Sequence, residues 1–191
     1  MTGRHNDSIA GRRFSAERNR RIAVVGTTGS GKTALARRIS QQLDIPHVEL
    51  DALYWGPHWT PTPTEVFRQR TAQALSGDAW VVDGNYGKVR DIVWGRADAV
   101  VWLDYALPVI MWRLVWRTLH RIVTREELWS SNRERAWAQF FSHDSIFLWA
   151  LHTYRRRRRE YPLLLSRPEY AHLAVVHLRS PRSAHGWLAN L

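Results

Sequence analysis

The segment Gly26-Thr27-Thr28-Gly29-Ser30-Gly31-Lys32-Thr33 constrains the fold more than any other part of the chain. It has the spacing G-x-x-x-x-G-K-[ST] and lies between the apolar run Ile22–Val25 and a helical pattern that begins near Ala34. In a strand–loop–helix setting, the backbone N–H groups of such a loop turn toward phosphate, the lysine reaches the outer phosphates and the final hydroxyl can bind Mg²⁺. We therefore expect a nucleoside triphosphate, ATP or GTP, to bind here. The predicted nucleotide contacts are Gly26, Thr27, Thr28, Gly29, Ser30, Gly31, Lys32, Thr33 and Ala34.

Short apolar runs alternate with helical patterns along the rest of the chain. This alternation is typical of an α/β fold in which a parallel sheet is joined by right-handed helical crossovers. Ligands of such sheets bind at the carboxyl ends of the strands, so the residues that follow each strand are the first candidates for a site. The expected strands are Ile22–Val25, His47–Leu50, Trp80–Val82, Ala99–Leu103 and Leu173–Leu178, and the expected helices are Lys32–Leu43, Thr64–Leu75, Leu107–Val123 and Pro181–Leu191.

Two segments depart from this alternation. Residues 1–20 are polar and basic without apolar periodicity, which predicts a mobile tail before a single domain at 21–191. Residues 124–165 are too long for an ordinary connection, show no strand pattern and are rich in Arg, Trp and Phe. This segment is predicted to be a mostly helical insertion over the nucleotide site, a candidate lid.

The chain is strongly basic, with a formal net charge of +11, and Lys32 and Lys88 are its only lysines. The arginine bias reflects either genome composition or selection for planar, bidentate phosphate recognition. So large a positive charge also makes nucleic acid a possible partner. The absence of cysteine, of an apolar signal core and of an apolar stretch of about 20 residues fits a cytoplasmic chain outside the membrane. The oligomeric state stays open, although exposed tryptophans could form a homodimer face.

Three aspartates follow predicted strands. Asp51 stands where a carboxylate could orient an acceptor substrate or accept its hydroxyl proton, and it could instead cap a helix. Asp83 and Asp104 both end an apolar run, as does the carboxylate that orients Mg²⁺ in such folds. Asp83 is the preferred candidate because Gly84 permits close approach of a ligand, whereas Asp104 could cap the helix that starts near Leu107. Thr33 and Asp83 are therefore the predicted metal-side residues.

The arginines group along the second half of the chain. Arg113, Arg117 and Arg121 recur every four residues, so a helix places them in one stripe. Arg133 and Arg135 lie in the predicted insertion, and residues 155–159 are five consecutive arginines, of which a helix can direct only two or three at the site. Phosphoryl transfer needs cations around the transferring group. The predicted catalytic residues are therefore Lys32, Asp51, Asp83, Arg113, Arg117, Arg155, Arg158 and Arg159.

These motifs together resemble the nucleoside-monophosphate-kinase group of P-loop proteins, and more closely the adenylate-kinase-related DNA topology modulation proteins. The resemblance rests on the phosphate loop, the arginine-rich segment before Glu160 and four further segments: Leu50–Trp55, Asp83–Tyr86, Ala97–Asp104 and Val176–Ser180. It implies a three-layer P-loop NTPase fold with a five-stranded parallel sheet in the order 2-3-1-4-5 and a helical lid. In adenylate kinases an arginine that grips both nucleotides closely follows the Asp-Gly pair, but here Asn85 and Tyr86 follow it. Asp51 is similar in position to the acceptor-binding aspartate of small-metabolite kinases such as shikimate kinase.

The sequence thus favours a Mg²⁺-dependent ATP phosphotransferase acting on a small acceptor, either a nucleotide or a metabolite. The alternative is a nucleotide-dependent DNA-binding or regulatory ATPase whose basic insertion and tail grip nucleic acid. A nucleotide binder that has lost catalysis is a third reading, against which the intact loop and Asp83 count.

Overall fold

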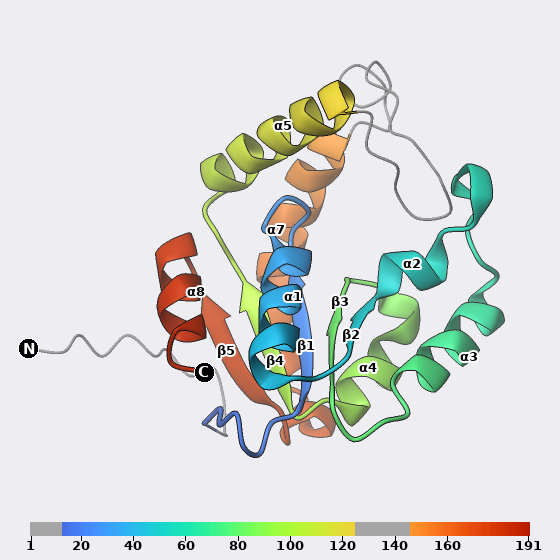
Figure 1. Ribbon diagram of the computed structural model, residues 1–191, viewed down its shortest axis with the longest axis vertical. Coiled ribbons are helices and arrows are strands. Elements are labelled where there is room, and N and C mark those ends of the chain that lie inside the picture. Colours follow the sequence, from blue (N-terminus) through green and yellow to red (C-terminus); the bar gives the residue numbers. More distant parts are fainter. Residues whose placement is uncertain (1–12, 125–145) are drawn as a thin grey trace, which may run out of the picture.

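A five-stranded, fully parallel sheet in the order β2-β3-β1-β4-β5 forms the centre of the protein (Figure 1). The computed structural model describes residues 13–124 and 146–191. The strand order implied by the family resemblance is confirmed. In chain order the elements are β1 (Arg21–Gly26), α1 (Lys32–Leu43), β2 (His47–Glu49), α2 (Leu50–Tyr54), α3 (Thr64–Ala74), β3 (Trp80–Asp83), α4 (Arg90–Arg96), β4 (Ala99–Leu103), α5 (Leu107–Thr124), α7 (Ile146–Leu165), β5 (Ala174–Leu178) and α8 (Pro181–Leu188).

The central strand β1 divides the core into two layers. Successive side chains of a strand point to opposite faces, so Ile22 and Val24 face one side while Ala23 and Val25 face the other. The first pair packs with residues of α1 and α8, and the second pair with residues of α3, α4 and α7. Because both faces are covered, the strand is apolar from Ile22 to Val25 rather than alternating.

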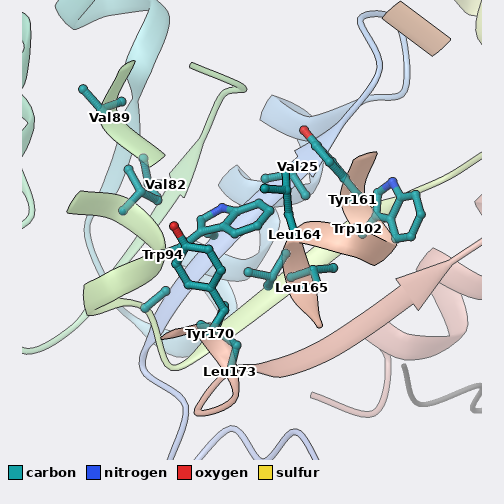
Figure 2. Packing of buried hydrophobic residues seen from close by; sticks show 14 of the residues in the cluster. Val25, Val82, Val89, Trp94, Trp102, Tyr161, Leu164, Leu165, Tyr170 and Leu173 are labelled. Atoms are coloured by element: carbon teal, nitrogen blue, oxygen red, sulfur yellow. The ribbon is translucent and has the colours of Figure 1, made fainter. Parts of the chain in front are cut away.

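Aromatic residues anchor α7 against the second of these layers (Figure 2). The Tyr161 ring packs edge-on against Trp94 of α4 and Trp102 of β4, at centroid distances of 5.8 and 5.5 Å. Leu165, one turn further along the helix, is also buried in this cluster. These contacts fix the rotation of α7 about its own axis and so decide which of its arginines faces the sheet.

The helix α5 runs beyond the carboxyl ends of the strands (Figure 1). Its buried residues Ile110 and Leu114 lie directly against the phosphate loop, because a Cβ at Gly29 would come within 3.0 Å of the Ile110 carbonyl oxygen. The opposite side of α5 exposes Trp112 and Trp116. Among the helices that the structure describes, none combines the length and the apolar character that a membrane span requires.

Several features differ from the expectation or extend it. The helices α2 and α4 were not expected, because five and seven residues are too few to show a helical period. Of the predicted insertion, Ile146–Leu165 forms α7, while residues 125–145 lie outside the described residues. Of the predicted tail, residues 1–12 lie outside them as well, whereas the Phe14 ring packs against Trp187 at 5.2 Å.

Candidate functional site

The phosphate loop between β1 and α1 depends on glycine at three positions. Gly26, Gly29 and Gly31 have φ values of +152°, +80° and +91°, a region that glycine adopts without strain. A side chain at Gly26 would lie 2.6 Å from the Leu103 carbonyl oxygen. Beyond the loop, the first turn of α1 has neither a side-chain cap nor an acidic residue. The N-terminal N–H groups of this helix are thus left without an acidic partner of their own, an arrangement suited to binding an anion.

Positive groups gather behind this loop. The burial of Lys32 lowers the pKa of its ammonium group to about 8, and the positive charges of Arg157 and Arg117 add to this effect, whereas Asp83 and Asp51 oppose it. The Arg157 guanidinium is buried and donates a hydrogen bond to the Gly26 carbonyl oxygen at 3.3 Å. Burial also lowers the pKa of Arg157. A bound anion would compensate both cations, and the loop is where it would lie.

Two oxygen-bearing side chains meet at the start of α1. The Thr33 hydroxyl donates a hydrogen bond of 2.6 Å to Oδ2 of Asp83, which is buried at the end of β3. The other carboxylate oxygen, Oδ1, lies 2.9 Å from Nε2 of His47. A hydroxyl and a carboxylate are ligands that suit Mg²⁺, which retains several water or phosphate ligands in such sites. The part of the chain that the structure describes holds no group of three His, Cys, Asp or Glu side chains for a metal, so a metal here would depend on such outside ligands.

Asp51 lies at the neighbouring strand end, in the first turn of α2. Its Oδ1 accepts a hydrogen bond of 2.5 Å from the Tyr86 hydroxyl. Burial raises the pKa of that hydroxyl, and the nearby Asp51 charge raises it further, so Tyr86 remains a proton donor. The Tyr86 ring is wedged between Tyr54 and Phe67, at centroid distances of 4.7 and 5.1 Å. The Tyr86 hydroxyl therefore holds the Asp51 carboxylate through Oδ1.

Asn85 connects the two sides of the site. Its side chain accepts a hydrogen bond from the Gly26 N–H at 3.1 Å and donates one of 2.5 Å to the Gly26 carbonyl oxygen. The Tyr161 hydroxyl also donates to Asn85 Oδ1, at 2.9 Å. A single amide thereby joins the loop after β3, the start of the phosphate loop and α7. In the sequence, Asn85 is part of the segment Asp83–Tyr86 and a departure from the adenylate-kinase pattern, but neither observation gave it a role.

The structure separates the predicted arginines into two groups. Arg113 donates to the Ser30 carbonyl oxygen at 3.0 Å, and Arg117 lies close enough to Lys32 to affect its pKa. Arg155 and Arg159 occupy exposed positions on α7 and line a surface hollow there. Within the run 155–159 the buried residue beside the phosphate loop is Arg157, which was not among the predicted catalytic residues.

Arg158 and Asp104 form an ion pair with each other. Arg158 Nε lies 2.9 Å from Asp104 Oδ1, and His177 Nε2 lies 3.0 Å from Asp104 Oδ2. The His177 ring also stacks on Trp102 at 4.2 Å. Since Asp104 is engaged in this buried network, Asp83 remains the strand-end carboxylate that contacts the phosphate-loop threonine.

Comparison with proteins of known structure identifies the fold of the chain. No protein-family model matches the chain, and no curated protein matches it. A gluconokinase from Sinorhizobium meliloti 1021 is 21% identical, with 94% of each chain covered and a TM-score of 0.51. Shikimate kinase from Acinetobacter baumannii, in complex with shikimate, is 16% identical over 88% of each chain, with a TM-score of 0.51. Shikimate kinase from Bacteroides thetaiotaomicron is 14% identical, with 88% of this chain and 94% of that chain covered and a TM-score of 0.50. The chain has the three-layer P-loop NTPase fold of the nucleoside-monophosphate-kinase type.

Proposed function

We propose that the protein is a Mg²⁺-dependent kinase that transfers the γ-phosphate of ATP to a hydroxyl group of a small acceptor. The observation that carries this proposal is the hydrogen bond between Thr33 and Asp83, a carboxylate close enough to the Lys32 ammonium group to affect its pKa. It supports a complete donor side, in which a phosphate-binding loop, a lysine and a metal-side carboxylate meet at one edge of the sheet.

On the donor side, the loop N–H groups and Lys32 would hold the outer phosphates of ATP. Arg113, Arg117 and Arg157 surround this position from α5 and α7 and would neutralise the charge that spreads over the transferring group. Thr33 and Asp83 would hold Mg²⁺, which when bound neutralises phosphate charge and draws the phosphates into line. Arg158 is assigned no such role, since Asp104 already binds it.

On the acceptor side, Asp51 would accept the proton of the attacking hydroxyl. A bond forms between the acceptor oxygen and the γ-phosphorus, the bond from that phosphorus to the ADP oxygen breaks, and the proton passes to Oδ2 of Asp51. Tyr86 holds Oδ1 and thereby orients the carboxylate. The names gluconokinase and shikimate kinase, borne by proteins of this fold, support a small hydroxyl-bearing metabolite as acceptor.

The finer family assignment is also part of this proposal. The segments quoted above support a place beside the adenylate-kinase-related DNA topology modulation proteins, and the cysteine-free sequence supports a cytoplasmic location. The DNA-binding alternative relies on the basic tail and insertion, much of which, residues 1–12 and 125–145, lies outside the described residues. No contact in the described part of the chain favours it over a kinase.

Incubation with γ-labelled ATP, Mg²⁺ and a panel of metabolites and nucleotides tests the proposal directly. We expect at least one hydroxyl-bearing compound to gain label. The Lys32→Ala variant should lose at least about 100-fold of this activity, because a cation at the transferring phosphate is removed. Arg38→Ala, which removes an exposed cation from the same helix, is the matched control and should retain activity. Unchanged turnover in Lys32→Ala, or a panel in which nothing gains label, would refute the kinase assignment.

The lowered pKa of Lys32 predicts that ATP binding is accompanied by proton uptake at this residue. At pH 8.5 the ligand-free ammonium group, with its pKa of about 8, is mostly deprotonated. Bound phosphate raises that pKa again, so binding should take up about 0.7 proton per ATP. The phosphates of ATP are already ionised at this pH and contribute little. Calorimetric titration in buffers of different ionisation enthalpy measures the uptake.

The Lys32→Arg variant is the matched control for the proton count, since a guanidinium stays charged at pH 8.5. It should bind ATP without the uptake. An equal uptake in both proteins would show that another group is responsible.

The acceptor side is tested by Tyr86→Phe, which keeps the ring and removes the donor to Asp51. We expect kcat to fall about tenfold with KM for ATP unchanged, because Asp51 loses its orientation while the donor side stays intact. Tyr54→Phe is the control, since its hydroxyl makes no hydrogen bond with other described residues. Steady-state kinetics on the labelled compound decide the matter: equal kcat values for the two variants would rule out a role for the Tyr86 hydroxyl.

A further inference from the structure

His47 is a partly buried polar side chain that has no role in the proposed reaction. It begins β2, the edge strand of the sheet, two residues before Glu49, which lies opposite Asp83 in the parallel pairing with β3. The imidazole reaches forward along the sheet to place Nε2 2.9 Å from Asp83 Oδ1. Only 12% of the His47 side chain and 6% of the Asp83 side chain are exposed.

The direction of this hydrogen bond follows from the chemistry of the two groups. A carboxylate oxygen accepts, so Nε2 of His47 carries the proton and donates it. The Thr33 hydroxyl donates to the other oxygen of the same carboxylate, Oδ2. Donors from β2 and α1 therefore hold the two oxygens, and the carboxylate plane is fixed from both sides.

The position of β2 does not depend on this imidazole. The strand is held by its backbone pairing with β3, in which His47 lies opposite Val81. Glu49, at the other end of β2, also forms an ion pair with Arg37 of α1 at 3.5 Å. Because other contacts hold β2 in place, the His47 side chain is available to orient the Asp83 carboxylate.

We propose that His47 is a positioning residue for metal binding. By holding Oδ1 of Asp83, it keeps Oδ2 directed at Thr33. Oδ2 of Asp83 and the Thr33 hydroxyl oxygen would then together face a metal-bound nucleotide. The inference rests on the proposed function, because it takes Thr33 and Asp83 as the metal-side pair. Groups that orient the ligands of a metal typically change metal affinity by about 10–100-fold when they are removed. His47 should accordingly affect the metal-dependent part of nucleotide binding and leave the metal-independent part unchanged.

The test compares ADP affinity by calorimetry in Mg²⁺ and in EDTA, for the full chain and its variants. His47→Leu removes the donor but fills the space, whereas the side-chain amide of His47→Gln can place an N–H near the position of Nε2. We expect His47→Leu to reduce the Mg²⁺-dependent gain in affinity about tenfold, with the affinity in EDTA unchanged. His47→Gln should stay within about threefold of the unmodified protein. Arg37→Ala, which removes the ion pair of Arg37 with Glu49 of β2, is the matched control and should keep the full gain.

A full Mg²⁺-dependent gain in His47→Leu would overturn the inference, as would an equal loss in His47→Gln and His47→Leu. If His47→Leu does not fold, the glutamine variant decides alone, since retention of the gain supports a hydrogen-bonding role and its loss contradicts it. Unmodified protein that binds ADP equally with and without Mg²⁺ would also overturn it. These outcomes are distinct from failure of the kinase proposal, because ADP binding requires no acceptor and no turnover.

Discussion

The two hydrogen bonds between the Asn85 side chain and the backbone of Gly26 are the interaction on which the site depends. Gly26 ends β1, beyond Val24, the last residue that pairs with β3, so its carbonyl and N–H groups need partners other than that strand. Asn85 supplies both, and Arg157 supplies a second donor to the carbonyl. Because Tyr161 also binds Asn85, the loop, the end of β3 and α7 are fixed relative to one another through one side chain.

The two aspartates of the candidate site are held in a similar way. Asp83 and Asp51 each have one carboxylate oxygen held by a ring-bearing side chain, His47 for the first and Tyr86 for the second. Neither hydrogen bond requires a positively charged donor. The cationic side chains of Lys32 and the buried Arg157 lie near the phosphate loop instead. This division of charge separates a donor side from an acceptor side within one edge of the sheet.

Much of the donor side could be predicted from the sequence, because the loop and its flanking elements are contiguous. The preference for Asp83 over Asp104 rested on Gly84, and the structure places Asp83 within hydrogen-bond distance of Thr33. Asn85 and Arg157 could not be found this way, since they reach Gly26 across 59 and 131 residues of chain. Because all five residues of the run 155–159 are arginines, the sequence does not indicate which of them faces the protein interior. The packing of Tyr161 against Trp94 and Trp102 orients α7 so that Arg157 points inward. His47 escaped notice because a lone histidine at a strand start has no local pattern.

A crystal structure with Mg²⁺ and a non-hydrolysable ATP analogue would test the central claim most directly, namely that the phosphate loop and the end of β3 form one metal–nucleotide site. We expect the outer phosphates on the N–H groups of residues 29–33 and on Lys32, with the metal beside Thr33 and Asp83. The bonds between Asn85 and Gly26 should be unchanged by the ligand. Nucleotide bound elsewhere, or a metal far from Asp83 with the phosphates in the loop, would contradict it.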